Sequence, residues 1–199
     1  MDKKPWNLST NMNLADNHNI KESDLIRGSI NGDRRMQELL YNTFAPKMYG
    51  VCLRYAGNAE DAQDILQEGF IKVFKNLERF RAEGSFEGWI RRIFVNTAIE
   101  HYRRAVNMYS VSETQENNVE DKDWSAFDKL AAKDLMKLIQ ELSPGYRTVF
   151  NLYVVEGYTH KDIAGMMGIS EGTSKSQLAR AKAILKNIIT GKQKESNIK

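Results

Sequence analysis

Cysteine is almost absent from this chain of 199 residues. Cys52 has no second cysteine with which to form a disulfide, and its apolar neighbours predict a buried thiol. The histidines are few and do not stand at metal-ligand spacing with each other or with Cys52; they are His18, His101 and His160. The sequence therefore predicts neither an internal disulfide nor a metal site.

Long apolar runs are missing too. The longest, such as 93–95, extend over a few residues, whereas a helix that spans a bilayer needs about 20. No apolar stretch follows the charged N-terminal residues, as a secretory signal would require. With 41% apolar and 28% charged residues, the composition is typical of a soluble globular protein. We expect a cytoplasmic chain with no membrane insertion.

Signatures of catalysis and of β-structure are also lacking. The chain contains no GxxxxGK[ST] phosphate loop, and no GxGxxG follows a strand-like segment. Apolar residues do not alternate with polar ones, and from Glu22 onward they recur at helical spacing. We predict an all-α fold, and we expect neither enzymatic activity nor a cofactor.

Charge is distributed unevenly along the chain. Residues 110–128 hold one lysine against six acidic residues, a net charge of −5, and residues 129–199 hold 12 basic against six acidic residues, a net charge of +6. The acidic stretch lacks apolar periodicity, which predicts a flexible linker over 107–124. A basic C-terminal part is typical of a nucleic-acid-binding protein, although solubility alone would also account for it.

The linker divides the chain into two small helical domains. We expect residues 1–20 to form a disordered tail and residues 21–106 to form the first domain. Residues 125–190 would form the second domain, and residues 191–199 a basic tail.

In the first domain, the spacing of apolar residues predicts three helices. The first covers about 32–55 and contains Pro46, which should kink it or split it in two. The second runs from 59 or 60 to about 77; it is acidic near its start and basic near its end, which suits the helix dipole. This charged face is as consistent with an ordinary solvated side as with a binding surface. The third helix spans 87 to about 104.

The loop before the third helix combines aromatic residues with glycine, and the helix itself is rich in arginine. This combination can hold an unstacked base against aromatic walls while cations bind the phosphates. Alternatively, the aromatic side chains belong to the core. We favour the core for Trp89 and Phe94, and both interpretations remain open for the loop residues Phe80 and Phe86.

In the second domain, one helix should end at Ser143-Pro144-Gly145, and another should cover 146–156. The stretch from Tyr158 to Leu185 then predicts a helix-turn-helix. Gly168 supplies the positive φ of the turn, Ser170 is a suitable N-cap, and the second helix is basic. A helix presented in this way can enter the DNA major groove. The alternative is an ordinary helix pair with a solvated basic face.

Two segments carry a family resemblance: DAQDILQEGFIKVFKNLERFRAEGSFEGWIRRIFVNTAIEHYRR and, after the acidic linker, SPGYRTVFNLYVVEGYTHKDIAGMMGISEGTSKSQLARAKAIL. In this order they resemble the small, two-domain sigma factors of bacterial RNA polymerase, of the extracytoplasmic-function (ECF) type. The resemblance covers roughly residues 22–190. It implies a protein that binds core RNA polymerase, recognises promoter DNA and helps to melt it.

The resemblance also implies roles for individual residues. The helix that would dock on the clamp coiled coil of the largest polymerase subunit presents Asp61, Asp64, Gln67 and Glu68. The loop and the third helix would bind the minus-ten element, with a non-template base flipped into the loop; the residues expected there are Phe80, Arg81, Ser85, Phe86, Arg91, Arg92, Asn96, Arg103 and Arg104. The residues expected at the minus-thirty-five element are Ser170, Glu171, Thr173, Lys175, Ser176 and Arg180.

Ser174 departs from the family pattern, because many such motifs place an apolar residue there. The departure weakens the expected packing of the second helix and leaves its anchoring to Leu178, Ala181 and Leu185. The resemblance further implies that the acidic linker threads toward the RNA exit path, and that an anti-sigma factor binds both domains.

Two other classes of protein remain alternatives. A DNA-binding regulator that acts without polymerase would use the same helix-turn-helix, but it leaves the aromatic loop and the acidic helix face unexplained. A helical adaptor or sequestering protein leaves the basic second helix unexplained.

Overall fold

The computed structural model describes residues 20–108 and 132–196, which form helices and connecting turns without a β-strand. The prediction of an all-α fold is confirmed. Residues 1–19 of the expected N-terminal tail, nearly all of the expected linker and the expected start of the second domain lie outside the described residues. We call residues 20–108 the N-terminal half and residues 132–196 the C-terminal half.

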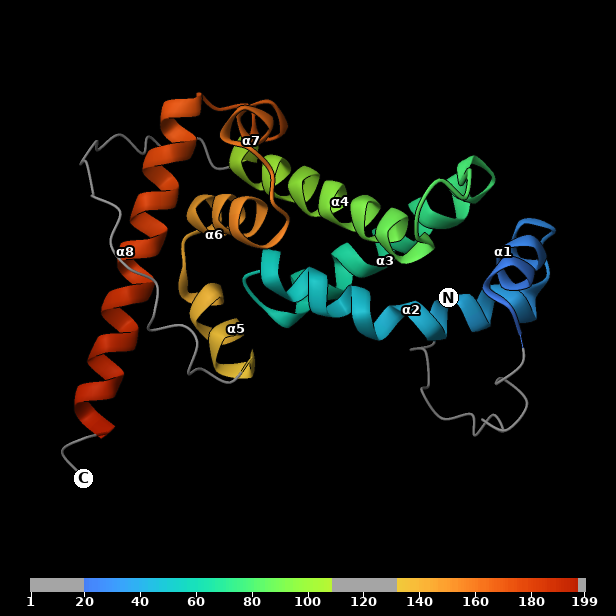
Figure 1. The fold of residues 1–199 in the computed structure, drawn as a ribbon, viewed down its shortest axis with the longest axis horizontal. Helices are drawn as coiled ribbons and strands as arrows, with labels where there is room; N and C mark the ends of the chain where they lie inside the picture. The colour runs from blue at the N-terminus through green and yellow to red at the C-terminus, as the bar shows by residue number, and fades with distance from the viewer. Residues whose placement is uncertain (1–19, 109–131, 197–199) are drawn as a thin grey trace.

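The N-terminal half contains four α-helices and a short 3-10 turn, η2. Their bounds are α1 Glu22–Ile30, α2 Arg34–Tyr55, α3 Ala59–Asn76, η2 Leu77–Arg79 and α4 Phe86–Met108. The C-terminal half consists of α5 Ala132–Glu141, α6 Pro144–Phe150, a π-helical turn η3 Asn151–Val155, α7 His160–Met167 and α8 Glu171–Ser196. Figure 1 shows α2 and α4 lying side by side, with α8 standing across their far end and α6 between.

We expected Pro46 to kink this helix or to split it in two; α2 continues through Pro46 as one helix, so the split does not occur. Proline lacks the N–H that would bond to the carbonyl four residues earlier, that of Asn42. Both residues are exposed, and water can therefore satisfy the free carbonyl. Asp33 caps the start of the helix, where its carboxylate accepts from the backbone N–H groups of Arg35 and Met36 at 2.9 and 3.3 Å.

Two expected boundaries in the C-terminal half also change. The helix expected over 146–156 begins earlier, at Pro144, because proline fits the first turn of a helix, and it becomes the π-helical turn η3 from Asn151. The basic tail expected over 191–199 is helical as far as Ser196, since α8 does not end before it.

The hydrophobic core runs through both halves as one connected cluster, from Leu25 to Ile189. In the N-terminal half, α3 and α4 approach closely at Gly69, where an added Cβ would lie 2.2 Å from the ring of Phe94. Phe94 is completely buried, as expected for a core residue. Small residues at such crossings allow two helices to pack at short distance.

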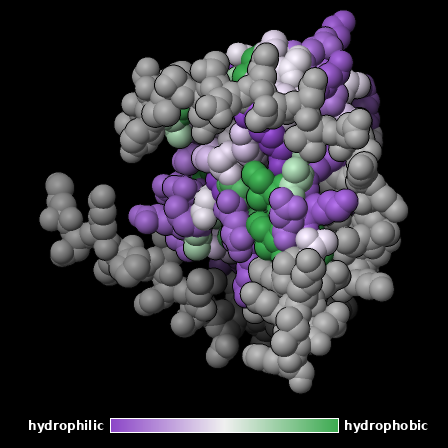
Figure 2. Space-filling model, turned by 90° about the vertical axis from the view of Figure 1, so that its left-hand side faces the viewer, coloured by the Kyte–Doolittle hydropathy of each residue, from purple (hydrophilic) through white to green (hydrophobic). Residues whose placement is uncertain are grey.

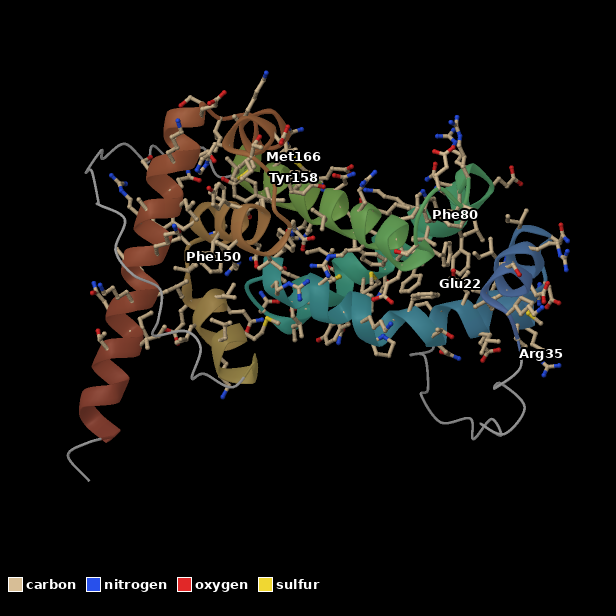
Figure 3. All side chains as sticks on the ribbon, in the orientation of Figure 1. Glu22, Arg35, Phe80, Phe150, Tyr158 and Met166 are labelled. Atoms are coloured by element: carbon tan, nitrogen blue, oxygen red, sulfur yellow. The ribbon has the colours of Figure 1, made fainter. Side chains whose placement is uncertain are left out.

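The C-terminal half packs directly on the N-terminal half: α5 and α6 contact α2, and α7 contacts α4. Figure 3 shows Phe80 at one end of α4, and Tyr158 and Met166 at the opposite end, where α7 lies. Figure 2 shows the face on the α8 side, where a small central group of apolar residues is surrounded by polar ones. Within the described parts of the chain, no helix is long and apolar enough to cross a membrane.

Candidate nucleic-acid interface

A hollow of about 440 Å³ lies where the loop after η2 meets the start of α4. Apart from the acidic Glu83, its lining residues are aromatic, basic or small; the full set is Arg79, Phe80, Arg81, Glu83, Gly84, Ser85, Gly88, Trp89 and Arg92. Four residues expected at the minus-ten element are therefore brought together here, namely Phe80, Arg81, Ser85 and Arg92. Aromatic walls beside cations offer both stacking and phosphate contacts to an unstacked nucleotide.

Backbone geometry shapes the loop around this hollow. Ala82 has φ 57° and Gly84 has φ 108°, so the chain turns twice through conformations that L-residues rarely adopt. Ser85 then starts α4: its hydroxyl accepts from the backbone N–H of Gly88 at 3.1 Å, which is the geometry of an N-cap. The hydroxyl expected to contact DNA thus already caps the helix.

Three aromatic rings stand beneath and beside the hollow. Phe86 is completely buried and does not line the hollow; it supports Phe80 and Trp89, whose ring centroids lie 5.0 and 5.7 Å from its own. Trp89 is half-buried and also lines the hollow, so it serves both as core and as wall. A role of Phe86 at the minus-ten element would consequently be indirect.

The arginines along α4 differ in their partners. Arg91 donates from Nε and Nη2 to both carboxylate oxygens of Glu156, in the C-terminal half, at 2.8 Å each. These hydrogen bonds raise the pKa of Arg91. Arg103 donates to the backbone carbonyl of Gly165 in α7 at 3.0 Å. By contrast, the side chains of Arg92 and Asn96 are exposed.

The structure connects α3 and α4 through charges. Glu68, expected to contact polymerase, accepts from Arg104, expected to contact DNA, at 2.5 Å, and from Lys72 at 3.1 Å. Asp64 and Gln67 are exposed on α3. Asp61 is half-buried at the start of that helix, where the amide of Asn58 donates to its carboxylate at 3.0 Å.

The helix-turn-helix forms as the sequence predicts. Gly168 has φ 71° and ends α7, and the Ser170 hydroxyl accepts from the backbone N–H of Thr173 at 2.9 Å, which caps α8. Glu171 and Lys175 are exposed near the start of α8, whereas Ser176 and Arg180 are half-buried. Arg180 donates to the hydroxyl of Tyr146 at 3.2 Å, which holds it against α6.

The contacts of two residues in this arrangement, His160 and Glu156, were not predicted from the sequence. His160 lies with Nδ1 2.9 Å from the hydroxyl of the completely buried Ser174, and this polar contact replaces the apolar one that the family pattern led us to expect. A serine at an apolar position could have signalled such a partner. Glu156, which pairs with Arg91, gave no comparable signal, because its partner lies 65 residues away along the chain.

Comparison with known proteins gives matches along most of the chain. Residues 40–107 match the family model described as Sigma-70 region 2, and residues 132–185 match the one described as Sigma-70, region 4. The RNA polymerase sigma-H factor of Pseudomonas aeruginosa is 31% identical over 174 residues, which cover 81% of this chain and 90% of that protein. The ECF RNA polymerase sigma-E factor of Haemophilus influenzae is 30% identical over 182 residues, 85% of this chain and 96% of that protein.

Among solved structures, a co-crystal structure of the sigma factor RpoE with the anti-sigma factor NepR from Bartonella quintana is 19% identical in sequence. It aligns with a TM-score of 0.47 over 77% of this chain and 96% of that one. The two family regions occur here in order, in a chain that spans almost the full length of the two sequence relatives. This chain belongs to the sigma-70 family of RNA polymerase sigma factors, and within it to the ECF type.

Proposed function

We propose that this chain is an alternative sigma factor that directs core RNA polymerase to a set of promoters and helps to melt them. Residues 21–106 would bind polymerase and the minus-ten element, and residues 125–190 would bind the minus-thirty-five element. Residues 107–124 would connect these two domains. The observation that carries the proposal is the occurrence of both sigma regions, in order, within one chain. A regulator that acts without polymerase would not need the first region.

The minus-ten role is supported by the hollow at the start of α4. Phe80 and Trp89 offer ring surface, while Arg81 and Arg92 offer positive charge at the same opening. Unstacking a base costs a few kcal/mol. Stacking on an aromatic side chain contributes about 1–3 kcal/mol, which together with phosphate contacts can offset this cost. The DNA strand would continue along α4. We assign its contacts there to Arg91, Asn96, Arg103 and Arg104.

The minus-thirty-five role is supported by the geometry of α8. Its capped N-terminus carries Glu171 and Lys175 on the exposed side, where side chains of a recognition helix reach base edges or phosphates. Ser170, Thr173 and Ser176 would add hydroxyl contacts. We assign Arg180 to the DNA backbone, which requires it to leave Tyr146.

The polymerase role is supported by the acidic, partly exposed start of α3. Asp61, Asp64, Gln67 and Glu68 would face a basic helical partner, for which charge complementarity favours association. The chain would contribute binding rather than catalysis, since the chemistry belongs to the polymerase, and it would act in the cytoplasm without a cofactor. We also propose an anti-sigma factor as its inhibitory partner, which co-purification from the native host would test.

Association with core RNA polymerase tests the proposal. The wild-type chain should co-elute with purified bacterial core polymerase in a stoichiometric complex. Asp64→Lys should weaken that association about tenfold, because it puts a cation against a basic partner. Gln63→Lys, a matched exposed position on the same helix, should have little effect. Absence of co-elution for the folded wild-type chain would favour the polymerase-independent regulator.

A further inference from the structure

Among the residues that line the hollow at the start of α4, one is acidic, Glu83. Three arginines line the same hollow, namely Arg79, Arg81 and Arg92. Cations and aromatic rings suit a nucleotide, whereas a carboxylate repels the phosphate of that nucleotide. The stacking and phosphate contacts proposed for this site therefore leave Glu83 without a role.

The carboxylate of Glu83 keeps its capacity to accept hydrogen bonds. Within residues 20–108 and 132–196, no ion pair involves Glu83, although arginines line the same hollow. The residue is also exposed. A carboxylate has two acceptor oxygens, so Glu83 can accept from a donor group on a molecule that enters the hollow.

The loop that carries Glu83 is held at both ends. Phe80, labelled in Figure 3, packs on the buried Phe86 before the loop, with ring centroids 5.0 Å apart. After the loop, the side-chain cap of α4 fixes the chain. Between these points the backbone turns on either side of Glu83, with φ 57° at Ala82 and φ 108° at Gly84. Glu83 thus stands in a fixed turn, as a residue that discriminates between ligands must.

The edge of an unpaired base carries a hydrogen-bonding pattern that a carboxylate can read. Cytosine, adenine and guanine each have an exocyclic amino group, which donates to a carboxylate. Thymine has a carbonyl oxygen where cytosine has its amino group, and two acceptors that face each other repel. A carboxylate in the hollow consequently favours amino-bearing bases over thymine, while arginines beside it can donate to the acceptors of the same base.

We propose that Glu83 is a specificity-determining residue of the hollow, which selects a base with an exocyclic amino group and disfavours thymine. The inference rests on the proposed function, which places an unstacked base of the minus-ten element at this site. The arginines and the aromatic rings supply affinity, whereas Glu83 supplies the choice between bases.

Selection of single-stranded DNA by the complex of this chain with core RNA polymerase tests this assignment. A randomised pool is incubated with the complex, and the retained strands are sequenced. With the wild-type chain, one position of the retained strands should be depleted of thymine about tenfold, the size of effect that one good base contact gives. In Glu83→Gln the depletion should fall below about threefold, because an amide both donates and accepts. The total amount of retained DNA should not fall, since the change removes a negative charge near the phosphates.

Glu78→Gln is the matched control. Glu78 is an exposed acidic residue on η2, in the same part of the chain, and it does not line the hollow. The control removes the same charge and should keep the wild-type depletion of thymine.

A second measurement isolates the amino group. One retained strand is synthesised with cytosine, deoxyuridine or thymine at the selected position, and its binding to the wild-type complex is measured by fluorescence anisotropy. Deoxyuridine has the carbonyl oxygen of thymine without its methyl group. Both the deoxyuridine and the thymine strand should bind about tenfold more weakly than the cytosine strand.

Three results would overturn the role of Glu83: no depletion of thymine with the wild-type chain, equal depletion in wild type and Glu83→Gln, or tight binding of the deoxyuridine strand, which would make the methyl group the rejected feature. Failure of the wild-type chain to bind core polymerase would instead remove the proposed function, and the inference with it. A complex that selects bases independently of Glu83 would leave the proposed function intact and remove this inference alone.

Discussion

A single hydroxyl, that of Ser174, lies at the centre of the helix-turn-helix packing. Its partner His160 stacks on Tyr153, with ring centroids 4.5 Å apart, and so connects η3, α7 and α8 through one imidazole. Burial lowers the pKa of His160, and the nearby charge of Lys175 lowers it further. At the residue scale, the surroundings of His160 next to the recognition helix consequently favour its neutral form.

This preference predicts a pH effect on stability. Because folding lowers the pKa of His160, the unfolded chain binds more protons near and below the ordinary value of 6.5, and stability falls as the pH drops through that region. Tm, measured by circular dichroism, should fall less between about pH 7.5 and about pH 5.5 in His160→Phe than in wild type. This pH range brackets the ordinary pKa of histidine, about 6.5. Ser174→Ala, which keeps the imidazole, should retain most of the wild-type slope. An equal dependence of Tm on pH in all three proteins would contradict the assignment of this effect to His160.

At the scale of elements, the contact between α3 and α4 sets the position of the arginine-bearing helix. Gly69 lets the ring of Phe94 lie directly against the α3 backbone. Phe94 also packs edge-on against Phe70, with ring centroids 5.2 Å apart. A shift of α4 would move the loop and the hollow at its start, because Ser85 caps that helix.

Replacement of this glycine is expected to be destabilising. Gly69→Ala should lower the free energy of unfolding by about 1–3 kcal/mol, since its Cβ would overlap the Phe94 ring. Gly50→Ala, inside α2 with no atom within 4 Å of the added Cβ, should instead stabilise by up to about 1 kcal/mol through helix propensity. Urea denaturation of both variants measures these changes. A Gly69→Ala protein as stable as Gly50→Ala would show that the helices can separate without loss.

At the scale of the whole molecule, hydrogen bonds connect the C-terminal end of α2 to side chains of the C-terminal half. The amide of Asn151 donates to the carbonyl of Arg54 across the interface at 2.7 Å, and to the carbonyl of Arg147 within its own half at 2.9 Å. Loss of that side chain leaves the carbonyl of Arg54 without this partner, whereas the carbonyl of Arg147 keeps the backbone N–H of residue 151. A carbonyl that loses its partner at a partly buried site costs free energy.

The wild-type chain should therefore unfold in one calorimetric transition, whereas Asn151→Ala should lose about 1–3 kcal/mol and separate into two transitions. Thr148→Val is the control, since the buried Thr148 hydroxyl donates to the carbonyl of Pro144 within α6, at 2.8 Å. A single transition with an unchanged midpoint in Asn151→Ala would mean that the halves fold independently of this contact.

The all-α fold and the helix-turn-helix could be predicted from the sequence because they depend on local spacing: apolar residues at helical intervals, Gly168 at a positive φ and Ser170 as a cap. The family was predicted from the resemblance of two segments in a fixed order. The burial of Phe86 and the pairing of Arg91 with Glu156 depended on tertiary structure alone. Periodicity tells which face of a helix is apolar but not what covers it, and an ion pair between residues 65 positions apart leaves no mark on either local segment.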